Sequence, residues 1–201
     1  MIHPDTEIRF IDQIVGYGVV ATKLIPKGTI TWVQDELDSV YTDQQVASFS
    51  PLMRQHFETY CFTNGQGLKV LCWDIAKYVN HSFRPSCFTT AYDFEIAIRD
   101  IQPGEQLTDD YGYLNLDEPF EPVDEGCERK IVFPDDLLNF HHTWDAMLRE
   151  VIPSIFRQPQ PLKPYISKAT WSDVSRLRKN PNEMRSVLNC YYKKLGKVST
   201  Q

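Results

Sequence analysis

The first third of the chain alternates short apolar, β-branched runs with turns that contain glycine and proline. Residues 6–15, 18–24 and 29–33 are rich in Ile, Val and Thr, and the segments Gly16-Tyr17-Gly18 and Pro26-Lys27-Gly28 separate them. Runs of this length between such turns predict β-strands.

The next segment mixes both kinds of element. Residues 42–59 predict a helical insert, because a threonine and then a Ser-Pro pair stand where two helical turns can begin. Residues 60–62 and 68–73 flank Asn64-Gly65-Gln66-Gly67, which predicts a hairpin. Residues 87–98 predict one further strand.

The pattern changes to a helical period after Pro134-Asp135-Asp136. Apolar residues then recur at helical spacing, as Leu137, Phe140, Trp144, Leu148, Val151 and Ile155. Thr170 with Asp173 resembles a capping pair, and Pro181–Leu195 predicts a last helix ended by Gly196. The predicted fold class is mostly β with some α. Residues 1–122 are expected to form a β-rich body, and residues 123–201 a helical C-terminal lobe.

Composition narrows the function classes. The chain has 201 residues, 42% of them hydrophobic, and a formal net charge of −6, which disfavours nonspecific nucleic-acid binding. No stretch approaches the roughly 20 apolar residues of a membrane span. Five cysteines lie far apart without a C-x-x-C pair, so reduced thiols in an intracellular protein are expected, in the nucleus or the cytoplasm.

Three segments are candidates for chemistry: Gly16-Tyr17-Gly18, the Asn80-His81-Ser82 segment, and residues 99–113. Each is weak alone, since a G-x-G is usually a turn and an N-H-S triplet is usually a loop that satisfies its own backbone. Their order and spacing together are specific.

The three segments together resemble the SET-domain protein lysine methyltransferases. The family's G-x-G opening is matched by Gly16–Ala21, its R-F-x-N-H-S-C-x-P-N motif by Lys77–Ser86, and its R-D-I-x-x-G-E-E-L-T-x-D-Y-G motif by Arg99–Gly112. The resemblance implies a SET fold of small curved β-sheets with pseudoknot-like C-terminal threading. It also implies methyl transfer from S-adenosylmethionine to a lysine of a histone tail or another basic protein.

The resemblance also implies roles for individual residues. Tyr111 is the catalytic tyrosine, and it meets the cofactor together with Val15, Tyr17, Asn80 and His81. The substrate channel is assigned to Tyr60, Phe62, Asp109 and Tyr113. For Tyr60 and Phe62, core packing is an equal alternative.

Methyl transfer needs a neutral amine. Lysine has a pKa near 10.4, so only about one side chain in a few thousand is neutral at pH 7, which corresponds to roughly 4 to 5 kcal/mol. An apolar channel beside a cationic sulfonium favours the neutral form. The sequence offers no evident general base.

Two departures from the family stand out. Relatives bind zinc through a C-terminal C-x-C-x4-C segment and the cysteine after N-H-S, but here that position is Phe83 and the tail offers only Cys127, so we predict no structural zinc. Phe120, Phe133 or the lobe could close the channel instead. Asp109 replaces the usual aromatic residue, and its carboxylate either faces the channel or points outward.

Two other functions stay open. Asp109 and the missing cysteines favour a non-catalytic SET-fold module that holds a peptide or cofactor. A thiol hydrolase would need Cys87 or Cys127 with His141 or His142, but no cysteine-protease signature surrounds them. No nucleic-acid or membrane partner is expected, and the sequence does not predict an oligomeric state.

Overall fold

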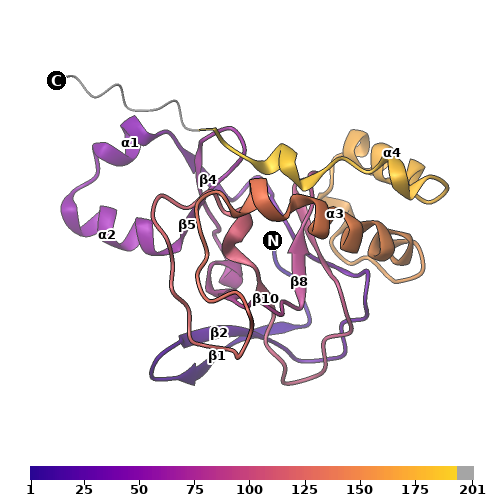
Figure 1. Ribbon diagram of the computed structural model, residues 1–201, viewed down its shortest axis with the longest axis horizontal. Coiled ribbons are helices and arrows are strands. Elements are labelled where there is room, and N and C mark those ends of the chain that lie inside the picture. Colours follow the sequence, from indigo (N-terminus) through magenta and orange to yellow (C-terminus); the bar gives the residue numbers. More distant parts are fainter. Residues whose placement is uncertain (194–201) are drawn as a thin grey trace.

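The computed structural model describes residues 1–193 as small β-sheets with helices around them (Figure 1). The strands are β1 Thr6–Asp12, β2 Gly16–Ala21, β3 Ile30–Val33, β4 Ser39–Tyr41, β5 Cys61–Thr63, β6 Lys69–Leu71, β7 Asn80–His81, β8 Cys87–Thr89, β9 Phe94–Ala97 and β10 Thr108–Asp109. The α-helices are α1 Asp43–Ala47, α2 Pro51–Tyr60, α3 Asp136–Ile155 and α4 Lys168–Arg176. The short 3-10 helices are η1 Ile75–Tyr78, η2 Tyr111–Tyr113, η3 Lys163–Tyr165, η4 Pro181–Glu183 and η5 Val187–Cys190.

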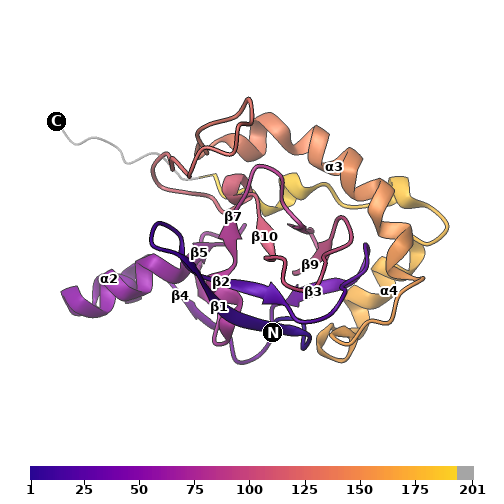
Figure 2. The same cartoon turned by 90° about the horizontal axis from the view of Figure 1, so that it is seen from below.

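The strands form four small sheets. β1 and β2 make an antiparallel hairpin, and the antiparallel sheets β3-β9-β8 and β4-β6-β5 follow. The last pair, β7 with β10, is parallel and joins segments far apart in the sequence. Figure 2 shows the β1–β2 hairpin and α3 at opposite edges of the molecule, with β7, β9 and β10 between them.

Helices α1 and α2 begin where polar side chains accept hydrogen bonds from backbone amides of the first turn. Thr42 and Gln45 form a capping box at α1, and Ser50 caps α2 with Pro51 in its first turn, as the sequence predicts. A cluster of edge-to-face rings, Tyr41, Phe49 and Phe57, holds this insert against β4 at centroid distances of 5.3–5.4 Å.

One hydrophobic core joins the β-sheets to the C-terminal lobe. Ile30, Phe88 and Phe94 from the sheets lie in the same buried cluster as Trp144 and Leu148 of α3. The division at residue 122 therefore separates two parts of the sequence whose apolar side chains share this cluster, while a second buried cluster lies within residues 1–122. No helix within residues 1–193 is both long enough and apolar enough to span a membrane.

The Gln160 side chain also connects the lobe to the β-rich body. Its carbonyl oxygen accepts from the Ile30 backbone amide at 2.8 Å, and its amide nitrogen donates to the carbonyls of Gly28 and Ile155, both at 2.9 Å. One lobe side chain thus pairs with the edge of β3 as a neighbouring strand would.

Three details differ from the sequence-based expectation. Residues 87–98 form two strands rather than one, because a turn with Asp93 at φ 58° reverses the chain between β8 and β9. Ser167, not Thr170, caps α4, which begins at Lys168. The single helix expected at 181–195 is replaced by η4 and η5, and Leu195 and Gly196 lie outside the described residues.

Gly28 tests the contact between body and lobe. A Cβ at Gly28 would lie 2.5 Å from Ser154 Cβ and 2.9 Å from the Ile155 amide nitrogen, and its φ is +87°. Gly104 has a similar φ of +86°, but its nearest neighbour would be 4.0 Å away. We expect Gly104→Ala to cost about 1–2 kcal/mol for the left-handed conformation alone, and Gly28→Ala to cost about 1–3 kcal/mol more for the overlap. Urea unfolding of both variants measures the difference, and equal losses would contradict this account of the contact.

Candidate functional site

The parallel pair of β7 and β10 brings two of the candidate motifs together. Thr108 pairs with Asn80 and Asp109 with His81, so the Asn-His pair lies directly beside the strand that leads into Tyr111. Asp110 then caps η2, its Oδ1 accepting from the Gly112 amide at 2.9 Å. Two motifs that are far apart in the sequence are therefore in direct contact in the fold.

Asn80 connects this strand pair to the glycine-rich turn. Its Nδ2 donates to the Tyr17 carbonyl at 3.0 Å and to Gln106 Oε1 at 3.1 Å. A Cβ at Gly18 would lie 2.4 Å from that Gln106 oxygen and 2.8 Å from Asn80 Nδ2, so a larger residue there would displace both side-chain ends. Tyr17 and the neighbouring Val15 are exposed, at 55% and 37%. The predicted cofactor residues therefore lie together with an open outer side.

His81 lies against Tyr111. Its Nδ1 accepts from the Tyr111 backbone amide at 3.1 Å, while its buried Nε2 has no partner within the described residues. Burial lowers the pKa of His81, which favours the neutral ring. Phe83 and Phe120 pack on it at centroid distances of 4.4 and 5.8 Å, so it is enclosed by aromatic rings.

Tyr111 is held through its hydroxyl as well as its backbone. The hydroxyl donates to the Val79 carbonyl at 2.7 Å, and Phe120 packs on the ring at 5.7 Å. Burial, with Asp109 and Glu95 nearby, raises the pKa of Tyr111, so the phenol stays protonated near neutral pH. Because its one hydrogen is used by Val79, the oxygen offers lone pairs to any other neighbour.

The structure separates the two aromatic residues of the predicted Y-x-F segment. Tyr60 packs on Tyr78 at 5.2 Å, and Tyr78 in turn contacts Tyr17 at 6.4 Å, so Tyr60 lies toward the cofactor residues. Phe62 packs on Trp32 at 6.1 Å and lines a cavity of about 1000 Å³ that Tyr113 also lines. These two residues therefore face different parts of the site.

Asp109 points inward. It is 2% exposed, and its Oδ2 accepts from the Tyr113 hydroxyl at 3.2 Å, while the same hydroxyl lies 2.9 Å from Glu95 Oε1. Burial, and then the neighbouring Glu95, raise the pKa of Asp109 well above its usual range. Glu95 went unnoticed in the sequence because it stands between apolar residues of a strand and belongs to no motif.

Arg129 is a second residue without a sequence signal. Its guanidinium makes ion pairs with Asp110 and Asp136, and its carbon lies 4.7 Å from the ring centroids of both Phe83 and Phe140. Burial opposes the charge, but the hydrogen bonds that the guanidinium donates to the two aspartates raise the pKa of Arg129. Arg129 thus ties the Tyr111 turn to α3.

The same region explains the glycine of the Tyr-Gly-Tyr sequence. A Cβ at Gly112 would lie 2.8 Å from Arg129 Nη2 and 2.9 Å from the Trp144 ring.

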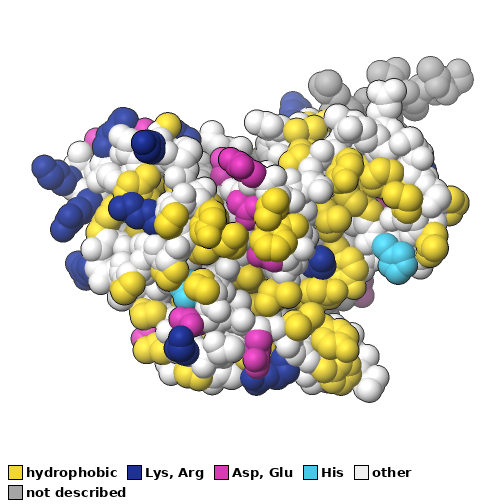
Figure 3. All heavy atoms as spheres, turned by 180° about the vertical axis from the view of Figure 1, so that it is seen from behind, with side chains coloured by type: hydrophobic (Ala, Val, Ile, Leu, Met, Phe, Trp, Pro, Cys, Tyr) yellow, Lys and Arg dark blue, Asp and Glu magenta, His cyan; other side chains and the backbone are white. Residues whose placement is uncertain are grey.

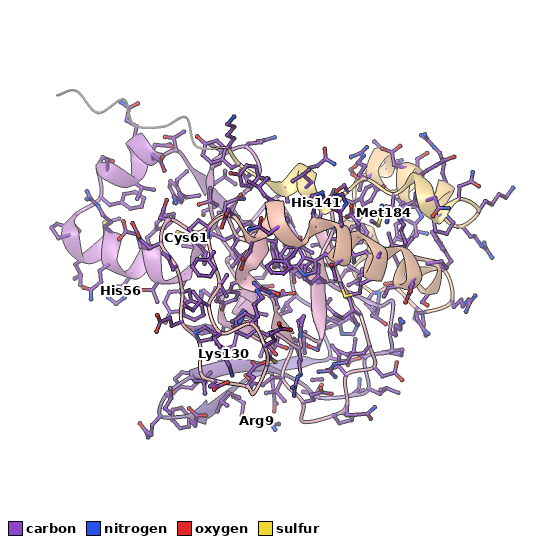
Figure 4. All side chains as sticks on the ribbon, viewed as in Figure 1. Arg9, His56, Cys61, Lys130, His141 and Met184 are labelled. Atoms are coloured by element: carbon purple, nitrogen blue, oxygen red, sulfur yellow. The ribbon has the colours of Figure 1, made fainter. Side chains whose placement is uncertain are left out.

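The N-H-S segment contacts Glu125. Ser82 Oγ and the Phe83 amide both donate to Glu125 Oε2, at 3.0 and 3.1 Å. The connection after residue 115, where Figure 4 marks Lys130 below α3, therefore packs on the N-H-S segment through ordinary side chains.

The thiol-hydrolase candidates do not have the accessible, ionised cysteine that such an enzyme needs at Cys87, which lies buried near Asp109. Cys87 is 1% exposed, and burial raises its pKa well above the usual value, which opposes the thiolate that a hydrolase needs. His141 and His142 lie on α3, with ring centroids 3.8 Å apart. Within residues 1–193, no three His, Cys, Asp or Glu side chains are arranged to hold a metal ion.

Comparisons with known proteins give one family. Residues 16–112 match the family model of the SET domain. A crystal structure of a Plasmodium falciparum protein, described provisionally as a histone methyltransferase, is 18% identical, with a TM-score of 0.41 over 55% of this chain and 95% of that chain. No curated protein matches the chain. The matched range holds all three motif segments, from Gly16 to Gly112, and the small β-sheets with helices are those of the SET fold. Residues 16–112 of the chain belong to the SET-domain family.

Proposed function

We propose that this protein is an S-adenosylmethionine-dependent protein-lysine N-methyltransferase that acts on a histone tail or another basic protein. The observation that carries the proposal is the contact of His81 with Tyr111 across the β7–β10 pair. It unites the candidate cofactor residues with a buried, neutral tyrosine hydroxyl.

The chain's own residues fit such a cofactor. Tyr17 offers an exposed aromatic face beside the backbone at Val15, Asn80 is anchored next to it, and His81 has a buried Nε2 without a protein partner. These groups would hold the cofactor, which supplies the methyl group as a sulfonium when bound.

Tyr111 suits a reaction that depends on positioning. Its hydroxyl is fixed by Val79, stays protonated, and directs oxygen lone pairs at its surroundings. An oxygen placed in this way orients an amine N–H or a polarised methyl group without itself exchanging a proton.

The cavity beside Phe62 and Tyr113 is suited to a basic segment. Asp35, Glu36 and Asp93 line it together with Met1, whose amino group pairs with Asp35, and no Lys or Arg lines it within the described part of the chain. Figure 3 shows acidic side chains near the middle of one face, with Lys and Arg gathered at its left edge. Because opposite charges attract a ligand before contact, the lining favours a lysine-bearing, basic partner.

The ion pairs of Arg129 support the proposal because they hold the turn that carries Tyr111 in a fixed position. Asp110, which caps the Tyr111 turn, is 3% exposed, and Asp136 of α3 is 2% exposed. A guanidinium shared by two buried carboxylates links these elements in the region where relatives use zinc.

We expect Tyr111→Phe to lower kcat by about 100-fold or more, because the variant loses the oriented oxygen while keeping the ring. Cofactor affinity should stay within a few-fold, measured by calorimetry, and methyl transfer to a basic peptide is measured with labelled cofactor. Tyr41→Phe, in β4, is the matched control. Full activity of Tyr111→Phe would refute its role, and cofactor binding by the wild type without any transfer would favour a non-catalytic module.

Removing the guanidinium should be costly. We expect Arg129→Met to lose about 3–5 kcal/mol of unfolding free energy, because two buried carboxylates lose their partner. In the control Arg149→Met, the lost pair with Asp145 is 3.7 Å long and its arginine is 37% exposed, so the cost should be within about 1 kcal/mol. Denaturant titration measures both, and similar small losses would show that Arg129 does not hold the site.

Ionic strength tests the substrate class. We expect the KM for a peptide with arginines beside the lysine to rise as salt increases from about 0.01 to 0.1 M, since the Debye length falls from about 30 to about 10 Å. The KM of a peptide with alanines in those places should change less, and Glu36→Gln should reduce the difference. A KM that is indifferent to salt for both peptides would contradict electrostatic attraction.

A further inference from the structure

The reaction proposed above leaves one proton without a destination. A lysine reaches the site mostly as an ammonium, and it must lose a proton before its nitrogen can attack. Tyr111 stays protonated, and the Nδ1 of His81 already accepts from the Tyr111 amide. Neither residue is free to act as the base.

A pair of carboxyl groups lies behind the cavity wall. Tyr113 is one of the lining residues, and its hydroxyl is within hydrogen-bond distance of Glu95 Oε1, at 2.9 Å, and of Asp109 Oδ2, at 3.2 Å. Glu95 comes from β9 and Asp109 from β10, so the fold places the two carboxyls on either side of one phenol.

Geometry requires the pair to share a proton. The single hydrogen of the Tyr113 hydroxyl can serve only one carboxylate at a time, and the buried Asp109 and the half-buried Glu95 repel each other on either side of it when both are charged. The Asp109 Oδ1 is buried without a partner within the described residues. The cluster therefore rests with one proton and one negative charge, and burial raises the pKa of both carboxyls.

We propose that the Glu95–Asp109 pair accepts the proton of the substrate ammonium, and that the Tyr113 hydroxyl relays it from the cavity. An N–H bond of the ammonium breaks as that proton binds the Tyr113 oxygen, while the hydrogen already on this oxygen moves to Glu95. The substrate becomes a neutral amine, Tyr113 is unchanged, and the charge of the pair goes from −1 to 0.

This role rests on the proposed function, and the surroundings of the pair agree with it. Burial makes the singly charged pair more basic than an exposed carboxylate. The other ionisable groups near it are Tyr111, Asp110, Cys72, Cys87 and the amino group of Met1. Burial raises the pKa values of Tyr111, Cys72 and Cys87, so these groups stay neutral and do not compete for the proton.

The test compares pH profiles of methyl transfer. Glu95→Gln keeps the shape of the side chain but cannot accept the proton, Asp109→Asn removes the neighbouring carboxyl whose charge makes Glu95 more basic, and Tyr113→Phe removes the relay while keeping the ring. We expect each to lower kcat/KM at pH 7 by about 100-fold, a typical contribution of a general base. The deficit should shrink toward pH 10, where solvent removes the proton instead. Glu150→Gln, an exposed carboxylate on α3 outside the cavity lining, is the control and should show neither the loss nor this pH dependence.

Two further measurements separate the outcomes. With a peptide that contains thialysine, whose amine is less basic than that of lysine, the loss of kcat/KM in the variants at pH 7 should be smaller. Infrared spectra of the resting protein at pH 7 should contain a protonated carboxyl band that Asp109→Asn removes. A loss that is equal at every pH, or the absence of that band, overturns the acceptor role alone. Failure of the wild type to methylate any basic peptide overturns the proposed function and the acceptor role together.

Discussion

Two adjacent residue pairs in the parallel β7–β10 ladder determine where nearly every candidate site residue lies. The pairing of Asn80–His81 with Thr108–Asp109 puts the Asn-His pair on one side of a backbone ladder and the turn of Tyr111 at its end. A ladder this short contributes only a few net hydrogen bonds of about 1 kcal/mol each, so it depends on contacts outside itself. The site is therefore a property of the whole chain rather than of its motifs.

Those outside contacts come largely from the C-terminal part. Arg129 joins Asp110 to Asp136, Phe120 covers His81 and Tyr111, and α3 shares a core with the β3-β9-β8 sheet. In a metal-bound relative, tetrahedral ligands fix the corresponding segment by coordination. Here the same restraint comes from a half-buried guanidinium, two buried carboxylates and aromatic rings, each with a defined direction of contact.

Local signals explain what the sequence predicts well. The caps at Thr42 and Ser50 and the Asn-Gly hairpin involve residues close in the chain, and all three have the expected geometry. Asp93 could not be foreseen as a turn, because its left-handed conformation is imposed by the pairing of β8 with β9.

The candidate site is less predictable than the fold, since the residues that contact its side chains are distant from them in the sequence. The motif marks Tyr111, Asn80 and His81, and it also marks Asp109 as unusual. The direction of Asp109 depends on Glu95 and Tyr113, and the importance of Arg129 depends on Asp136. Neither dependence leaves a pattern along the chain.

The hydrogen bonds of Gln160 have a consequence for solubility. β3 pairs with β9 on one edge, and on the other its backbone is covered by residues 1–3 and by the Gln160 side chain. An uncovered strand edge is a template on which a second chain can add a strand. By occupying this edge from a position 130 residues later in the chain, the lobe closes a route to edge-to-edge aggregation at the centre of the molecule.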